Sequence, residues 1–208
     1  MKRYYFRLNV VLLLCVSMNI PVSFSESLSP KDISDLLYFH LKVRGSVRPE
    51  AADMRSIGHS DELKKLAERW VARCTKQVPD PTKEKEYSHT MSTMAISYEP
   101  KQPTVMDMAK TWEEEKKFYT YADNSCSKVC SNYKKLIWAP STNFGCAMQK
   151  CEADKSPDKK PFYLMVCVYK TPWYQDNAKP YVSGRTCSRC PSGFRCHQNQ
   201  CVQVGVAR

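Results

Sequence analysis

Glu115 is the acidic residue whose place in the sequence most favours partial burial. It follows Trp112 by three residues, at the margin of the apolar stripe of a predicted helix. A buried carboxylate without a partner is strongly unfavourable unless it takes up a proton. We therefore expect Glu115 to have a polar partner in the fold. The alternative is a solvated glutamate within the charged run 113–117.

Cysteine is the second residue type whose number carries chemical information. The chain has 11 cysteines, and because Cys15 falls in a predicted signal peptide, ten remain. An even number in a secreted chain indicates five disulfides. Cys187 and Cys190 have the spacing of zinc ligands, but an oxidising compartment and two further cysteines close by favour disulfides. Spacing alone leaves the connectivity open.

No motif in the sequence assembles the residues of nucleophilic catalysis. Oxidised cysteines cannot supply the thiolate of a Cys–His enzyme, and neither a Gly-x-Ser-x-Gly elbow nor a phosphate-binding loop occurs. His40 is expected to pack in the core. His59 precedes a helix cap, and His197 lies among the last cysteines. We predict that the chain is not an enzyme.

The first residues are typical of a secretory signal peptide. Three basic residues precede an apolar run over 10–16, and Ser23 and Ser25 supply small side chains before a predicted cleavage after residue 25. A buried N-terminal strand is the alternative. No later apolar run is long enough to span a bilayer, so we predict a soluble, secreted chain.

The positive charge of the chain carries less information about partners. Removal of residues 1–25 leaves 183 residues and lowers the formal net charge from +11 to +8. Such a charge favours anionic lipids, glycosaminoglycans or nucleic acid. The lysines are scattered, however, and no run of five basic residues occurs. Solubility explains the charge better, and we expect no nucleic-acid partner.

Three amphipathic helices are predicted in the first half of the chain. A Ser cap, a first-position Pro and an acid open the helix expected over 29–44. A second helix begins at Ser60, and a third is capped by Thr104. Residues 75–103 are polar, contain four prolines and include one strand-like piece near Tyr87. We expect them to form a long surface connection.

The second half of the chain is predicted to contain strands. Residues 133–138 and 143–148 are expected to be strands joined by a turn. The continuous apolar run 162–169 is typical of a central strand that is covered on both faces. Helices before and between such strands predict an α/β fold, a three-layer α–β–α sandwich, over residues 26–170.

The stretch Cys126–Ala147 resembles the signature of the CAP superfamily, the cysteine-rich secretory proteins, antigen 5 and pathogenesis-related 1 proteins. The family's anchor residues stand here at matching spacing: Cys130, Tyr133, Trp138, Ser141, Gly145 and Cys146. Residues 40–74 and 112–115 continue the likeness, which within the family is greatest for the helminth venom-allergen-like proteins. The resemblance implies the same three-layer fold.

Many members of this family carry two His and two Glu that line a central cleft and bind a divalent metal. By resemblance, Val78, Ser92 and Asn132 replace three of these ligands, and Glu115 alone is retained. His89 approaches the cleft only if the alignment around it slips, and one imidazole with one carboxylate is a poor zinc site. We expect no metal and no cofactor. Asn132 is instead expected to donate a hydrogen bond to Glu115.

The resemblance also implies a cysteine-rich hinge over residues 187–208, after a linker over 171–186. The hinge is too short to bury a core, so two disulfides must hold it. The implied pairs are Cys74–Cys146, Cys126–Cys130 and Cys151–Cys167 in the main domain, and Cys187–Cys196 and Cys190–Cys201 in the hinge.

Relatives in this family bind sterols beside an aromatic loop, and some hold fatty acids between two helices. The corresponding loop carries Phe118, Tyr119 and Tyr121, whose flat rings suit a sterol. Aromatic residues at the end of a helix are also common packing anchors. For an acyl chain, the first helix offers Leu37 and Leu41 as candidates to line a groove.

These observations predict a secreted, extracellular CAP protein that binds small hydrophobic ligands, sterol first and fatty acid second. The alternative is a protein-interaction module, an immune modulator or protease inhibitor that acts on an extracellular host protein through its surface and hinge. A metal-dependent hydrolase ranks last.

Overall fold

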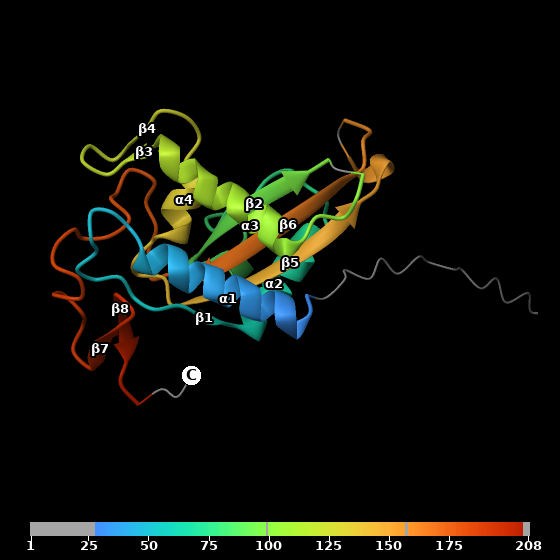
Figure 1. Ribbon diagram of the computed structural model, residues 1–208. Coiled ribbons are helices and arrows are strands. Elements are labelled where there is room, and N and C mark those ends of the chain that lie inside the picture. The colour runs from blue at the N-terminus through green and yellow to red at the C-terminus, as the bar shows by residue number, and fades with distance from the viewer. Residues whose placement is uncertain (1–27, 99, 157, 206–208) are drawn as a thin grey trace, which may run out of the picture.

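A four-stranded sheet forms the centre of the computed structural model, which describes residues 28–98, 100–156 and 158–205 (Figure 1). The predicted signal peptide, residues 1–25, lies outside the described residues. The strand order is β1-β5-β6-β2, and only β1 and β5 are parallel. The strands are β1 (Gly58–His59), β5 (Asn143–Cys151), β6 (Phe162–Lys170) and β2 (Thr90–Ser97).

Helices cover both faces of this sheet, as the predicted three-layer arrangement requires. In Figure 1, α1 and α3 cross in front of the strands and α2 lies behind them. Alternate side chains of β6 divide between two hydrophobic clusters, one with α2 and the other with α1, α3 and α4. The helices are α1 (Pro30–Gly45), α2 (Asp61–Val71), α3 (Val105–Glu114) and α4 (Ser131–Leu136).

The three predicted helix starts are confirmed, because each depends on a local hydrogen bond. Ser29 accepts a bond from the backbone N–H of Asp32, whose carboxylate accepts one from the Ser29 N–H. Thr104 and Asp107 repeat this capping box at α3. At α2, the hydroxyl of Ser60 accepts from the Leu63 N–H at 3.3 Å.

Two predictions of secondary structure are wrong. Residues 133–138 are not a strand, because residues 131–136 form helix α4, which packs against β2 and α3. The polar segment 75–103 is more than a surface connection, since residues 90–97 form β2 along the edge of the sheet. Tyr87 lies in the short 3-10 helix η1 (Lys85–Tyr87) rather than in a strand.

The disulfides of the main domain differ from the implied pairs. The structure joins Cys74 to Cys151 and Cys146 to Cys167. Cys146 and Cys167 lie opposite each other on β5 and β6, on the face covered by α1 and α3. Cys151 points to the other face, where Cys74 follows the end of α2. A Cys74–Cys146 pair is wrong because the sheet separates these two side chains.

The other three disulfides are the ones that the resemblance implied: Cys126–Cys130, Cys187–Cys196 and Cys190–Cys201. The last two hold the hinge, which contains the hairpin of β7 (Phe194–His197) and β8 (Gln200–Gln203). The hinge is fastened to the core by the backbone N–H of Cys201, which donates to the Met54 carbonyl at 2.7 Å.

Arg44, near the end of α1, is a buried cation whose hydrogen bonds within the described residues all go to backbone carbonyls. Its side chain is 1% exposed. The guanidinium donates to five backbone carbonyls, those of Arg55, Leu136, Trp138, Ala139 and Ser141. Burial lowers the pKa of Arg44 to about 9, so the group remains charged at neutral pH. Carbonyl dipoles therefore replace the counter-ion that such a charge requires.

His40 is a core residue, as predicted. One ring nitrogen bonds the Leu36 carbonyl at 2.6 Å and the other bonds the Tyr169 hydroxyl at 3.0 Å. The ring also stacks on Phe144, with centroids 4.2 Å apart. Burial lowers the pKa of His40 to about 4, and the nearby charge of Arg44 acts in the same direction. The neutral imidazole is therefore part of the folded state.

The depressed pKa of His40 predicts a loss of stability in mild acid. Between pH 6.5, the ordinary pKa, and pH 4 the unfolded chain binds a proton that the folded chain does not. Between pH 7.5 and 4.5 we expect this group to remove about 2.5 kcal/mol from the free energy of unfolding. Urea unfolding of the wild type and His40→Gln at both pH values measures it. Equal losses in the two proteins would contradict the assignment.

The pairing of the cysteines predicts a specific peptide map. Trypsin cleavage after Lys150 separates Cys146 from Cys151, so the two possible partners of Cys74 fall in different peptides. We expect non-reducing mass spectrometry of the oxidised protein to find Cys74 linked to Cys151. A peptide that links Cys74 to Cys146 would show that the sheet faces are assigned incorrectly.

Candidate functional site

Glu115, which the resemblance identifies as the retained glutamate, has the polar partner that the sequence predicted. It opens the 3-10 helix η2 (Glu115–Phe118), directly after α3. The side-chain amide of Asn132 donates to its Oε1 at 2.7 Å, and the backbone N–H of Tyr133 donates to its Oε2 at 3.0 Å. Both carboxylate oxygens are therefore engaged with α4. The alternative of a freely solvated glutamate is wrong.

Asn132 also closes the open edge of the sheet. Its Oδ1 accepts from the backbone N–H of Met94, on β2, at 3.2 Å. The backbone carbonyl of Met94 accepts from the indole N–H of Trp112 at 2.9 Å. Unpaired backbone groups on an edge strand are otherwise a liability. Asn132, Glu115 and Met94 thus form a hydrogen-bonded strap that joins β2, α4 and η2.

Val78 and Ser92, the other two positions that the resemblance assigns to the family's metal site, lie elsewhere. They line a cavity of about 470 Å³, which we call the cleft cavity. Its lining residues are Val78, Pro79, Asp80, Pro81, Thr82, His89, Thr90, Met91, Ser92, Lys135, Thr171, Pro172, Trp173, Tyr174 and Asp176. Glu115 and Asn132 are not among them. The four positions are therefore divided between the strap and the cavity.

The cleft cavity contains one histidine, His89, which the sequence placed there only under a shifted alignment. Its ring is exposed and its backbone has a φ of 58°. Among the described residues, one group of three side chains of metal-binding type lies close together: Cys187, Cys190 and Cys201. All three of these sulfurs are in disulfides. Among the described residues, no group of free side chains therefore matches the ligands of the family's metal site.

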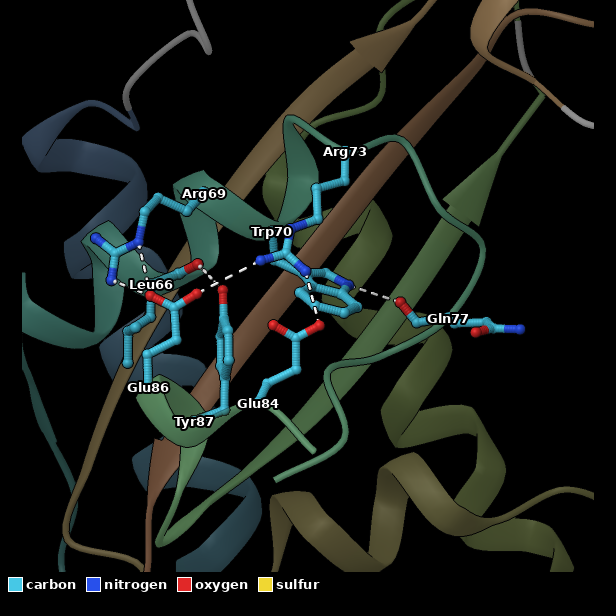
Figure 2. A network of polar contacts seen from close by, with 8 residues as sticks. All are labelled: Leu66, Arg69, Trp70, Arg73, Gln77, Glu84, Glu86 and Tyr87. Carbon is cyan, nitrogen blue, oxygen red and sulfur yellow. Dashed lines mark hydrogen bonds and ion pairs between the residues drawn. The ribbon is translucent and has the colours of Figure 1, made fainter. Parts of the chain in front are cut away.

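The wall of the cleft cavity is held in place by charged contacts from α2 and from the turn that follows it. Figure 2 shows Arg69 and Arg73 reaching back to the glutamates of the following connection. Arg69 bonds Glu86 at 3.0 Å, and Arg73 bonds Glu84 at 2.8 Å. A single exposed ion pair of this kind contributes little to the stability of the fold. Here, however, the two pairs lie over two buried aromatic rings.

Those buried rings are Trp70 and Tyr87, also drawn in Figure 2. The Trp70 indole donates to the Gln77 carbonyl at 2.7 Å, and the Tyr87 hydroxyl donates to the Leu66 carbonyl at 3.0 Å. The two rings meet edge to face, with centroids 5.4 Å apart. The connection that carries Val78 is therefore anchored to α2 at two points, at Gln77 and at Tyr87.

The predicted sterol loop is a hairpin of β3 (Tyr119–Thr120) and β4 (Ser125–Cys126). Tyr119 donates its hydroxyl to Asn124 at 2.9 Å and lies against Tyr133. Tyr121 stacks on Tyr181, with centroids 4.6 Å apart, and its hydroxyl donates to the Tyr181 carbonyl. Both tyrosines thus also act as packing anchors.

Phe118 differs from these two tyrosines because cations approach its ring. The amines of Lys117 and Lys128 lie 5.2 and 5.4 Å from its centroid. Cation–π contacts at such a half-exposed site are weakly stabilising. The three aromatic residues that the sequence grouped together therefore have separate surroundings.

A smaller cavity of about 330 Å³, which we call the Tyr121 groove, lies beside this hairpin. It is lined by Asp53, Tyr121, Pro140, Trp173, Lys179, Pro180, Tyr181, Val182 and Ser183. Of the three predicted sterol residues, Tyr121 alone lines it. Sequence reasoning missed Trp173 and Val182, which are 50% and 38% exposed. The sequence did offer one indication of these residues: they are large apolar side chains in a segment that is otherwise rich in proline and polar residues.

The segment predicted as a linker, residues 171–186, forms one side of this groove because it lies against the core. The Trp138 indole donates to the Trp173 carbonyl at 3.0 Å. The backbone N–H groups of Ala139 and Ala52 donate to the carbonyls of Pro180 and Val182, both at 2.8 Å. Leu37 and Leu41, the predicted acyl-chain residues, are partly buried against the main core and line neither cavity. They stay a prediction.

Comparison with known proteins assigns this arrangement of sheet, helices and disulfide-rich hinge to a class of α/β proteins. The family model of the cysteine-rich secretory proteins, CAP, matches residues 37–169. The chain belongs to the CAP family. Within the described residues, no helix combines the length and apolar character that a membrane crossing requires.

Individual relatives support the same assignment. GLIPR1-like protein 1 of Bos taurus is 34% identical over 174 residues, which are 81% of this chain and 70% of that protein. Peptidase inhibitor R3HDML of Mus musculus is 29% identical over 84% of this chain and 73% of its own length. The structure of venom allergen-like protein 4 of Schistosoma mansoni, 25% identical, matches with a TM-score of 0.59 over 76% of this chain and 97% of that one.

The strap predicts that Asn132→Asp destabilises the fold. The change removes the donor to Glu115 and places a second carboxylate against it. We expect the free energy of unfolding at pH 7 to fall by about 2 kcal/mol, the scale of an unsatisfied polar group that is removed from water. Chemical denaturation measures it. Asn177→Asp, at an exposed position, is the matched control, and equal midpoints for the two variants would exclude a structural role for the strap.

Proposed function

We propose that the protein is a secreted, non-catalytic CAP protein that binds a sterol in the Tyr121 groove. One observation carries this proposal: an apolar groove beside the predicted loop, with half-exposed Trp173 and Val182 on its wall. Exposed apolar side chains that line a concave surface are typical of ligand sites.

The chemistry of the groove suits a flat apolar body with one polar end. The stacked pair Tyr121 and Tyr181 presents a rigid aromatic surface, which loses little conformational freedom on binding. Asp53, Lys179 and Ser183 supply polar groups along the lining, where a single hydroxyl finds a partner. About 330 Å³ is at the lower end of ligand pockets, so part of a sterol would stay outside.

The non-catalytic role and the extracellular location are supported by observations other than those on the groove. Both oxygens of Glu115 are hydrogen-bonded to α4, so this carboxylate has a structural role, which supports a non-catalytic protein. The predicted signal peptide and the family assignment support secretion. A fatty acid along α1 is the second expected ligand, at Leu37 and Leu41.

Protein binding is a second candidate, because several relatives carry the name peptidase inhibitor. The half-exposed Trp173 suits an interface as well as a ligand, since aromatic residues are enriched at binding hot spots. Inhibition of an extracellular protease by the protein, with no sterol binding, would favour this candidate over the first.

A charge introduced in the groove predicts a selective loss of sterol affinity. We expect Val182→Asp to weaken binding at least tenfold, which corresponds to about 1.4 kcal/mol, because an ionised carboxylate is poorly solvated against a sterol. Direct titration with a fluorescent sterol measures the dissociation constant. Val204→Asp, at a site that is 60% exposed and far along the hinge sequence, should bind as the wild type does. Wild-type affinity in Val182→Asp would remove the groove from the mechanism.

A further inference from the structure

The cleft cavity contains two hydrogen-bond donors that the folded chain does not use. The hydroxyl of Ser92, on β2, is buried and has no hydrogen-bond partner. Ser92 as a whole is 3% exposed. A buried polar group without a partner is rare and calls for an explanation.

The second unused donor is the ammonium of Lys135, on α4. Across the described residues it forms no side-chain hydrogen bond or ion pair, and it lies 5.6 Å from the ring centroid of Tyr174. Burial lowers the pKa of Lys135, and the negative charges of Asp176 and Glu115 oppose that effect. A half-buried cation that makes only a ring contact is available to an acceptor from outside the chain.

The two acidic residues of the cleft cavity have hydrogen-bond partners within the chain, and Asp176 is also exposed. Asp80 accepts bonds from the backbone and hydroxyl of Thr82 and lies 3.3 Å from the amine of Lys83. Asp176 is exposed, and its carboxylate accepts from the Tyr174 hydroxyl. These charges lie on the solvent side and are screened there, whereas Ser92 and Lys135 lie deeper.

Much of the remaining wall is apolar, and the walls surround enough space for a small molecule. The apolar part consists of Val78, Pro79, Pro81, Met91, Pro172 and Trp173, and the rest of the lining is Thr82, His89, Thr90, Thr171 and Tyr174. A volume of about 470 Å³ is within the range of ligand pockets. The wall that carries Val78 is anchored by the Trp70 and Tyr87 contacts described above, so the cavity does not depend on a ligand for its shape.

We propose that the cleft cavity is a binding site for a small carboxylate with an aromatic or short aliphatic body. The carboxylate accepts hydrogen bonds from Lys135 and Ser92, and the body contacts Met91 and the ring of Trp173. This site uses residues at the place where the family's metal ligands are lost, and it is separate from the Tyr121 groove except for the shared Trp173.

Three probes of one shape test the charge requirement: phenylacetate, phenylacetamide and phenethylammonium. Titration of the full oxidised chain at pH 7, followed by calorimetry or by ligand-observed NMR, should give phenylacetate at least tenfold tighter than the other two. Tighter binding of phenethylammonium would assign the cavity to cations through its acidic residues and overturn the proposal. Equal affinities, or no binding by phenylacetate, would overturn it as well.

Two variants test the donors. Lys135→Met keeps most of the side-chain volume and should weaken phenylacetate at least tenfold, and Ser92→Ala should weaken it about threefold, with little change in phenylacetamide. Lys65→Met, on the exposed face of α2, is the matched control. Both cavity variants should keep the sterol affinity of the wild type, which separates this proposal from the sterol groove. Unchanged phenylacetate affinity in a folded Lys135→Met or Ser92→Ala protein would contradict the assigned roles.

Discussion

The buried guanidinium of Arg44 is the interaction on which the rest of the structure depends. Its five carbonyl partners come from residue 55 and from residues 136–141. It therefore ties α1 to the end of α4 and to the turn that leads into β5. Removal of this guanidinium would strongly destabilise the fold, because several buried carbonyls would be left without a hydrogen-bond donor. Through α4 it also sets the positions of Asn132 and Lys135.

The strap around Glu115 stabilises the place where the resemblance puts two of the family's metal ligands. In that place the chain has an amide, Asn132, which donates to the carboxylate and accepts from the edge of β2. Both ends of the amide are used, so the arrangement is satisfied without an ion. The two remaining positions, Val78 and Ser92, open into the cleft cavity instead. The four positions that the resemblance assigns to the metal site thus belong to a structural tie and to a separate pocket.

Features that depend on neighbouring residues were predictable from the sequence, and features that depend on the sheet were not. The capping boxes at Ser29 and Thr104 are local, and the continuous apolar run of β6 identifies a central strand. β2 was missed because half of its residues are Thr or Ser, so its sequence lacks a continuous apolar run although most of the strand is buried. The cysteine pairs were misassigned because the face of β5 on which Cys146 lies follows from register, which spacing does not reveal.

The same distinction applies to the candidate site. The bond between Asn132 and Glu115 followed from the likeness of the signature. Trp173 and Lys135 were missed because their positions result from long-range docking of the 171–186 segment and α4. The central claim is that this site is complete without a metal. Thermal unfolding of the mature protein in a titration with micromolar Zn²⁺ tests it most directly. The account predicts an unchanged melting temperature, and a saturable upward shift, as linkage to a bound ion requires, would contradict it.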